Sequence, residues 1–162
     1  PLTVSQSLPG IDGVVIVTTP QEVALLDSRK SINFAKTISV PVLGVVENMS
    51  GYTIRGESEP NSKISIMVPG GVPIYCQSDN EGRWEVTLDV FKTGGGEESS
   101  RELEVPFLGS LPFDPGIVRG GDDGVHRIIA DPEGETAKAF KSIVEGIVEQ
   151  LEKGSQRSLR II

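Results

Sequence analysis

Cysteine is almost missing from this chain of 162 residues, since Cys76 is the only one. A single thiol excludes an internal disulfide, so we expect a reducing, cytoplasmic setting. Basic residues are also few: 15 lysines and arginines face 23 acidic residues, and the formal net charge is −8. This charge argues against a nucleic-acid partner, which needs a basic surface. No apolar run approaches the roughly 18 residues of a membrane span, and no signal peptide is recognisable, so no membrane association is expected.

A phosphate-binding loop is missing as well, because the pattern G-x-x-x-x-G-K-[ST] occurs nowhere in the sequence. In that motif, backbone N–H groups and a lysine hold the phosphates of a nucleotide. The glycine triplet Gly94–Gly96 is not followed by Lys and Ser or Thr, so we interpret it as the start of a helix and not as a phosphate cradle. The chain alone is therefore not expected to hydrolyse ATP.

The sequence contains three short apolar runs, and the middle one is rich in β-branched residues. They are residues 14–17, 42–46 and 105–109. Such runs are typical of strands buried on both faces of a parallel sheet, so we expect the three to lie side by side and to point the same way. A helix from Pro20 to about Ile38 is predicted between the first two, with Thr19 as its cap, Pro20 at its first position and Glu22 closing a capping box.

The remaining segments divide the chain. Residues 52–89 have no helical period and predict an antiparallel β insert of three or four strands. Residues 1–51 and 90–153 are assigned to an α/β domain that includes a short helix at 98–104, a glycine-rich loop at 116–124 and a last helix at 134–153. The first eight residues are interpreted as the tail of a helix, and residues 154–162 as a flexible tail.

Polar residues follow the middle apolar run at its carboxyl end. Ligands of open α/β sheets bind at this end of the strands, and Glu47, Asn48 and Ser50 lie there. The amide of Asn48 offers donors and an acceptor, which suits the edge of a base. A turn in which the Asn side chain bonds the local backbone is the alternative.

Several motifs then occur together in order. They are TTPQEVAL (18–25), VPVLGVVENMSG (40–51), VFKTGGGEE (90–98), VPFLGSLPFDPGIV (105–118) and GGDDG (120–124). This set resembles the C-terminal half of the Mrp/ApbC-type P-loop ATPases, iron–sulfur cluster carriers related to MinD. The resemblance covers about two thirds of the chain, and it implies a partial P-loop NTPase sheet, Rossmann-like, with flanking helices.

The resemblance implies a cytoplasmic homodimer that binds ATP with magnesium and hands an iron–sulfur cluster to apo-proteins. Carried over by position, Asn48 would contact the adenine, and Pro112, Phe113 and Asp114 would line the same base pocket. The alternative for the segment 112–115 is a plain turn in which Asp114 caps the next segment. The phosphate and magnesium ligands would belong to the missing loop, so ATPase activity rests on the resemblance alone.

The sequence also departs from the family pattern at the cysteines that bind the iron–sulfur cluster. The family usually carries C-x-x-C after N-M-S, but here the β insert with its single Cys76 takes that place. Four thiolate-like ligands are the rule for iron–sulfur sites, and two copies of Cys76 supply two. Cys76 is thus a weak metal candidate, with a buried apolar residue as the alternative, and His126 is expected in a surface loop. Cluster binding stays open.

Two other function classes stay open as well. The first is a MinD- or ParA-like regulatory or scaffolding ATPase without a cluster. The second is a non-catalytic protein-binding module that works through the insert. In each case three parallel strands leave a sheet edge uncovered, so we expect the isolated chain to self-associate or to be only marginally stable.

Overall fold

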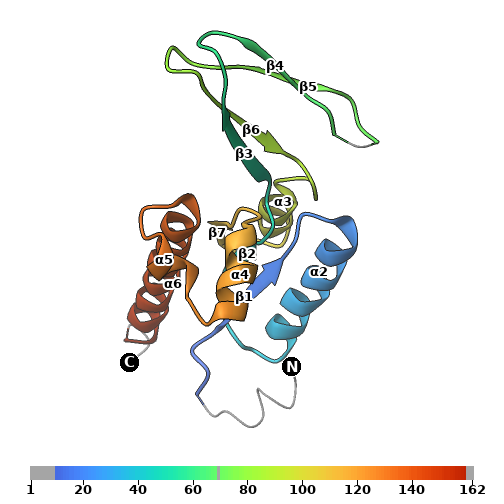
Figure 1. Cartoon of the computed structure of the whole chain (residues 1–162). Helices are drawn as coiled ribbons and strands as arrows, with labels where there is room; N and C mark the ends of the chain where they lie inside the picture. Colours follow the sequence, from blue (N-terminus) through green and yellow to red (C-terminus); the bar gives the residue numbers. More distant parts are fainter. Residues whose placement is uncertain (1–9, 69, 160–162) are drawn as a thin grey trace.

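A computed structural model describes residues 10–68 and 70–159 (Figure 1). The predicted helix at residues 1–8 lies outside the described residues. The elements in chain order are β1 (Val14–Thr18), α2 (Glu22–Thr37), β2 (Val42–Glu47), β3 (Tyr52–Glu57), β4 (Lys63–Ile66), β5 (Ile74–Gln77), β6 (Arg83–Leu88), α3 (Gly95–Glu102), β7 (Phe107–Ser110), α4 (Pro115–Asp123), α5 (Arg127–Ala130) and α6 (Glu135–Leu159). None of the described helices combines the length and apolar character needed to cross a membrane.

The three apolar runs form one parallel sheet with the order β1-β2-β7. Val46 on β2 and Leu108 on β7 pack with Leu111 and with Ile143 of α6. Neighbouring residues of a strand point to opposite faces, and accordingly Glu47 points to α3 on the other side. The sheet is therefore covered by α6 on one face and by α2 and α3 on the other, which confirms the predicted α/β fold.

The outer edge of β1 has no partner strand within the described part of the chain. Val17 on this strand is 61% exposed. A cavity of about 500 Å³ runs beside it between β1 and α2, with Phe34 and Ile38 among its lining residues. The uncovered sheet edge that the sequence predicted is thus present.

Local details differ from the prediction in three places. The N-cap of α2 is Gln21, without a side-chain cap bond, because Pro20 is buried in the core and not at the first helical position. Residues 116–124 are not a loop, because Asp114 caps α4 and Pro115 occupies its first turn. Residues 154–159, expected in a flexible tail, continue α6, since one interior glycine costs a helix only about 1 kcal/mol.

The predicted β insert has four strands in two antiparallel ribbons. The proximal ribbon pairs β3 with β6, and the distal ribbon pairs β4 with β5. Since β3 leads into β4 and β5 leads back into β6, the insert is one long hairpin with a bend, and it projects from the α/β body (Figure 1). We call residues 52–89 the β arm.

Candidate functional site

The two segments predicted to bind a base lie side by side at the carboxyl edge of the sheet. The Leu111 N–H donates to the Glu47 carbonyl at 2.7 Å, and the Ser50 N–H donates to the Leu111 carbonyl at 2.9 Å. Farther along, the Phe113 N–H donates to the Gly51 carbonyl at 2.8 Å. Backbone bonds therefore fix the loop after β2 against the loop after β7.

The side chain of Glu47 links this edge of the sheet to the start of α3. It is fully buried, at 0% exposure. One carboxylate oxygen accepts hydrogen bonds from the Gly94 N–H at 3.0 Å and from the Ser50 hydroxyl at 2.6 Å, and the other accepts from the Gly96 N–H at 2.6 Å. A carboxylate at a helix N-terminus satisfies its free N–H groups and its positive dipole end. The glycine triplet therefore leads into a helix and not around a phosphate, as predicted, but α3 begins at Gly95 and so three residues before the helix expected at 98–104, and the N–H groups of Gly94 and Gly96 are occupied.

Asn48 makes the local bond predicted as the alternative and keeps a free donor. Its Oδ1 accepts from the Met49 N–H at 2.9 Å, and its own backbone N–H donates to the Thr18 carbonyl at 2.7 Å. Within the described residues, the Nδ2 group of Asn48 has no hydrogen-bond acceptor. The side chain lines a cavity of about 340 Å³ on the β1 side, together with Thr19 and Asp27.

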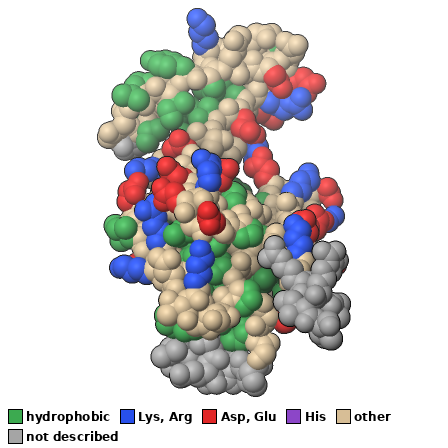
Figure 2. Space-filling view, turned by 180° about the vertical axis from the view of Figure 1, so that it is seen from behind, with side chains coloured by type: hydrophobic (Ala, Val, Ile, Leu, Met, Phe, Trp, Pro, Cys, Tyr) green, Lys and Arg blue, Asp and Glu red, His purple; other side chains and the backbone are tan. Residues whose placement is uncertain are grey.

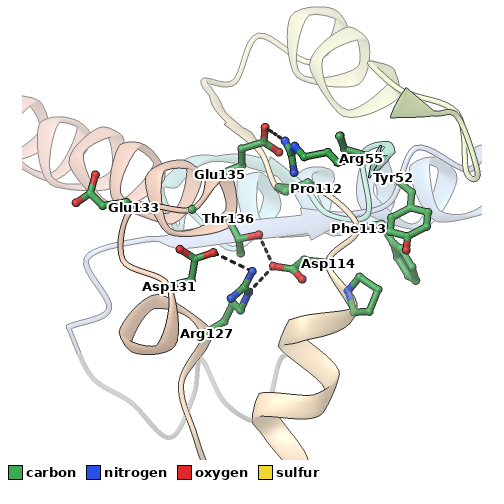
Figure 3. A pocket seen from close by; sticks show the side chains of 13 residues that line it. Tyr52, Arg55, Pro112, Phe113, Asp114, Arg127, Asp131, Glu133, Glu135 and Thr136 are labelled. Carbon is green, nitrogen blue, oxygen red and sulfur yellow. Dashed lines mark hydrogen bonds and ion pairs between the residues drawn. The ribbon is translucent and has the colours of Figure 1, made fainter. Parts of the chain in front are cut away.

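Pro112, Phe113 and Asp114 line a different cavity, of about 330 Å³, between the base of the β arm and the start of α6 (Figure 3). Its other lining residues are Tyr52, Thr53, Arg55, Pro115, Arg127, Asp131, Glu133, Gly134, Glu135 and Thr136. The structure therefore brings the loops of Asn48 and Pro112 together but directs Asn48 and residues 112–114 into separate cavities.

Asp114 is the most heavily bonded side chain of this cavity. Its Oδ1 accepts from the Gly116 N–H at 2.7 Å, and its Oδ2 accepts from Arg127 Nε at 2.6 Å and from the Thr136 hydroxyl at 2.7 Å. Burial by itself disfavours the charged form, but these bonds and the Arg127 charge outweigh it and lower the pKa of Asp114. The carboxylate thus joins the starts of α4, α5 and α6, and the capping role predicted as the alternative is present.

Arg55 closes the same cavity from the β arm. Its guanidinium donates to Glu85 at 2.7 Å on the paired strand and to Glu135 at the start of α6 (Figure 3). Tyr52 meets Phe113 edge to face, with ring centroids 5.5 Å apart. No local sequence pattern marks Arg55, Arg127 and Thr136, and only the fold brings them to Glu135 and Asp114.

Neither Cys76, the weak metal candidate, nor His126 lines these cavities. Cys76 is half-buried on β5, opposite Ile64 of β4. His126 is exposed between α4 and α5, as predicted for a surface loop. Across residues 10–68 and 70–159, no group of three or more His, Cys, Asp and Glu side chains is arranged to hold a metal ion.

Comparison with known proteins identifies the family to which the chain belongs. The ParA family model, described as NUBPL iron-transfer P-loop NTPase, matches residues 1–80 and 74–148. The iron-sulfur cluster carrier protein of Methanocaldococcus jannaschii is 38% identical over 151 residues, which cover 93% of this chain and 42% of that protein. The protein of the same name from Methanococcus maripaludis is 35% identical over 152 residues, covering 94% and 43%. The chain thus spans about two fifths of the length of these curated relatives.

Solved structures share the fold. The cell division ATPase MinD of Pyrococcus furiosus has a TM-score of 0.56 at 23% identity, covering 85% of this chain and 43% of that one. The septum site-determining protein MinD of Pyrococcus horikoshii, solved with Mg-ADP, has a TM-score of 0.55 at 20% identity, covering 84% and 41%. Identities this low indicate the fold alone. Because the family model matches most of the sequence, the chain belongs to the ParA-type family of iron-transfer P-loop NTPases.

Proposed function

We propose that this chain is the base-binding part of an ATP-dependent iron–sulfur cluster carrier. The observation that carries the proposal is the bonding of the loop after β2 to the loop after β7, at the edge where α/β sheets bind ligands. The unpartnered Nδ2 group of Asn48 supplies a donor in the cavity on the β1 side, and Pro112 with Phe113 supplies apolar surface in the separate cavity beside the arm, so we place the base against Asn48. These features suit the base of ATP.

The residues present do not form a binding site for the phosphates of ATP or for the magnesium ion. No phosphate-binding loop occurs in the sequence, and the N–H groups of Gly94 and Gly96 already bind Glu47. We propose that a phosphate-binding part of the protein adds a further strand to the open edge of β1. The exposed Val17 and the apolar cavity beside α2 support this position. The chain by itself then neither binds ATP tightly nor hydrolyses it.

The experiment is a titration of labelled ATP into a longer protein that includes the phosphate-binding part. Asn48→Ala should weaken binding about fivefold, because a hydrogen bond to a base contributes roughly 1 kcal/mol. Asn80→Ala is the matched control, since Asn80 is an exposed amide in the turn before β6. Equal affinity of the Asn48→Ala variant and the unmodified protein would refute the base assignment.

The iron–sulfur cluster is what a carrier of this kind transfers, and not its resident cofactor. Iron–sulfur clusters commonly take four protein thiolates, and Cys76 is the one thiol of the chain. We propose that a cytoplasmic homodimer carries the cluster to apo-proteins, with ligands beyond this chain. Anaerobic reconstitution of the longer protein with iron and sulfide, followed by absorbance, tests this. A cluster retained in the Cys76→Ser variant supports the proposal, and its loss contradicts it.

A regulatory ATPase without a cluster is the second candidate. It is favoured by the position of Cys76 on β5, paired with Ile64 and away from both cavities. The same reconstitution separates the two functions. If the longer protein binds ATP but takes up no iron under any condition, the carrier function is excluded and the regulatory function remains.

A further inference from the structure

The β arm leaves the body through two short segments, which we call its roots. The first root is residues 49–51, between Asn48 and β3, and the second root is residues 89–94, between β6 and α3. Within the described residues, the strands of the arm make their extensive contacts with one another and not with the elements of the body. Figure 2 shows the arm above the body and joined to it at its base. The orientation of the arm therefore depends largely on how its roots are held.

One carboxylate oxygen of Glu47 holds both roots. It accepts a hydrogen bond from the Ser50 hydroxyl of the first root at 2.6 Å and from the Gly94 N–H of the second root at 3.0 Å. Glu47 is fully buried at the end of the central strand β2. Hydrogen bonds to a carboxylate are stronger than those between neutral groups. The two roots thus share one fixed acceptor in the body.

Phe113 joins the two roots a second time. The centroid of its ring lies 5.5 Å from that of Tyr52, directly after the first root, and 5.9 Å from that of Phe91 in the second root. Edge-to-face aromatic pairs of this kind stabilise beyond the area that they bury. A Cβ atom on Gly51 would lie 2.8 Å from the Thr87 side chain of β6, so the first root also packs closely on the strand that leads to the second. A movement of one root therefore carries the other with it.

The direction of the Asn48 side chain depends on the first root. Its Oδ1 accepts from the Met49 N–H at 2.9 Å, so the amide follows the conformation of Met49. That residue has a φ of +60°, in the left-handed region that residues other than glycine rarely adopt, and its neighbours must hold it there. The next residue, Ser50, is fixed by its hydroxyl on Glu47 and by its N–H on the Leu111 carbonyl. The direction of the free Nδ2 group of Asn48 thus depends on how firmly Ser50 is held.

We propose that Ser50 is a positioning residue for the base site and that it couples this site to the β arm. The inference rests on the proposed contact of Asn48 with the base. Ser50 does not line the cavity of Asn48, and it acts by holding the first root, which fixes Met49 and so the direction of the Asn48 amide. Because coupling between two sites is reciprocal, a bound base restrains the arm, and a protein that grips the arm strengthens the binding of the base.

The first experiment uses the 162-residue chain without nucleotide, so it does not depend on the proposed function. Ser50→Ala removes the hydroxyl, and Ser50→Thr retains it. The residual dipolar couplings of the arm and of the Asn48 side-chain amide should both fall in Ser50→Ala and be kept in Ser50→Thr. Ser65→Ala is the matched control, because Ser65 is exposed on β4, and it should leave both sets unchanged. Couplings that stay unchanged in Ser50→Ala, or that change in only one of the two places, overturn the proposal.

The second experiment is the ATP titration of the longer protein. Ser50→Ala should weaken binding about threefold, as is common for neighbours in one hydrogen-bond network, and Ser50→Thr should restore it. If Ser50 acts through Asn48, then Ser50→Ala has no further effect once Asn48 is replaced by alanine. Additive losses in this double variant contradict the positioning role. If Asn48→Ala alone leaves the affinity unchanged, the proposed base contact fails, whereas the coupling of the arm to the Asn48 loop is decided by the experiment without nucleotide.

Discussion

The Glu47 carboxylate accepts a hydrogen bond of 2.6 Å from the backbone N–H of Gly96, which lies 49 residues farther along the chain. This bond joins the central strand β2 to the first turn of α3, and the whole β arm lies between these two elements in the sequence. Because Glu47 precedes Asn48 directly, the same bond fixes the start of the loop that carries the proposed base contact.

Removal of this carboxylate should destabilise the chain strongly. Glu47→Ala leaves two backbone N–H groups and the Ser50 hydroxyl without their acceptor, so we expect a loss of about 3 kcal/mol in the free energy of unfolding. Urea denaturation followed by circular dichroism measures it. Glu98→Ala, on the exposed side of the same first turn, is the control and should cost at most about 1 kcal/mol. Equal losses in the two variants would contradict the role given to Glu47.

Asp114 should make the free energy of unfolding depend on pH in the acidic range. Its pKa is lowered in the folded state, so its contribution is present above the unfolded value near 3.8 and disappears as the pH falls through the folded value. Asp114→Asn should therefore be less stable than the unmodified chain at pH 7, and the difference should shrink below about pH 4. Urea denaturation at a series of pH values measures this, and a difference that stays constant down to pH 2 would show that the lowered pKa plays no part.

Arg55 should orient the β arm without contributing much stability. It joins Glu85 within the arm to Glu135 of α6, and all three side chains are more than half exposed, so Arg55→Ala should cost at most about 1 kcal/mol. The arm should nevertheless become more mobile relative to the body, which residual dipolar couplings detect. Arg83→Ala is the control, since Arg83 pairs with Asp79 and Glu81 inside the arm. Unchanged couplings in Arg55→Ala would mean that the aromatic contact of Tyr52 with Phe113 suffices.

Gly56 should be intolerant of a side chain. A Cβ atom there would lie 2.3 Å from the ring of Trp84 on the paired strand, so Gly56→Ala should displace the indole and cost about 1–3 kcal/mol. Fluorescence of Trp84, the only tryptophan, reports the displacement. At Gly121 in α4 a Cβ meets nothing within 4 Å, so Gly121→Ala should stabilise the chain by about 0.5–1 kcal/mol. An unshifted emission spectrum in Gly56→Ala would show that the ribbon relaxes around the methyl group.

Much of the fold follows from local patterns. The apolar runs predict the three parallel strands, and the absence of a helical period in residues 52–89 predicts an antiparallel insert. The ends of the helices are harder to predict from the sequence, because they depend on contacts between distant residues. Pro20 leaves the first position of α2 when it packs into the core, and the glycines after Asp114 become helical once Asp114 caps them.

The candidate site was only partly predictable for the same reason. Asn48 and Pro112 stand at the ends of buried strands, so their adjacency follows from the sheet. The partners of Asp114 are 13 and 22 residues away, on α5 and α6, and Arg55 reaches α6 from the insert. No periodicity in the sequence encodes such contacts.

The sequence by itself determined the family, the strand set and the missing phosphate loop, because each depends on residue types at fixed short spacings. Only the tertiary structure decided that Glu47 caps α3, that Asn48 and Asp114 line separate cavities, and that the insert is a bent arm of two ribbons. These features depend on the direction in which each side chain leaves its element. That direction is set by packing between segments far apart in the chain.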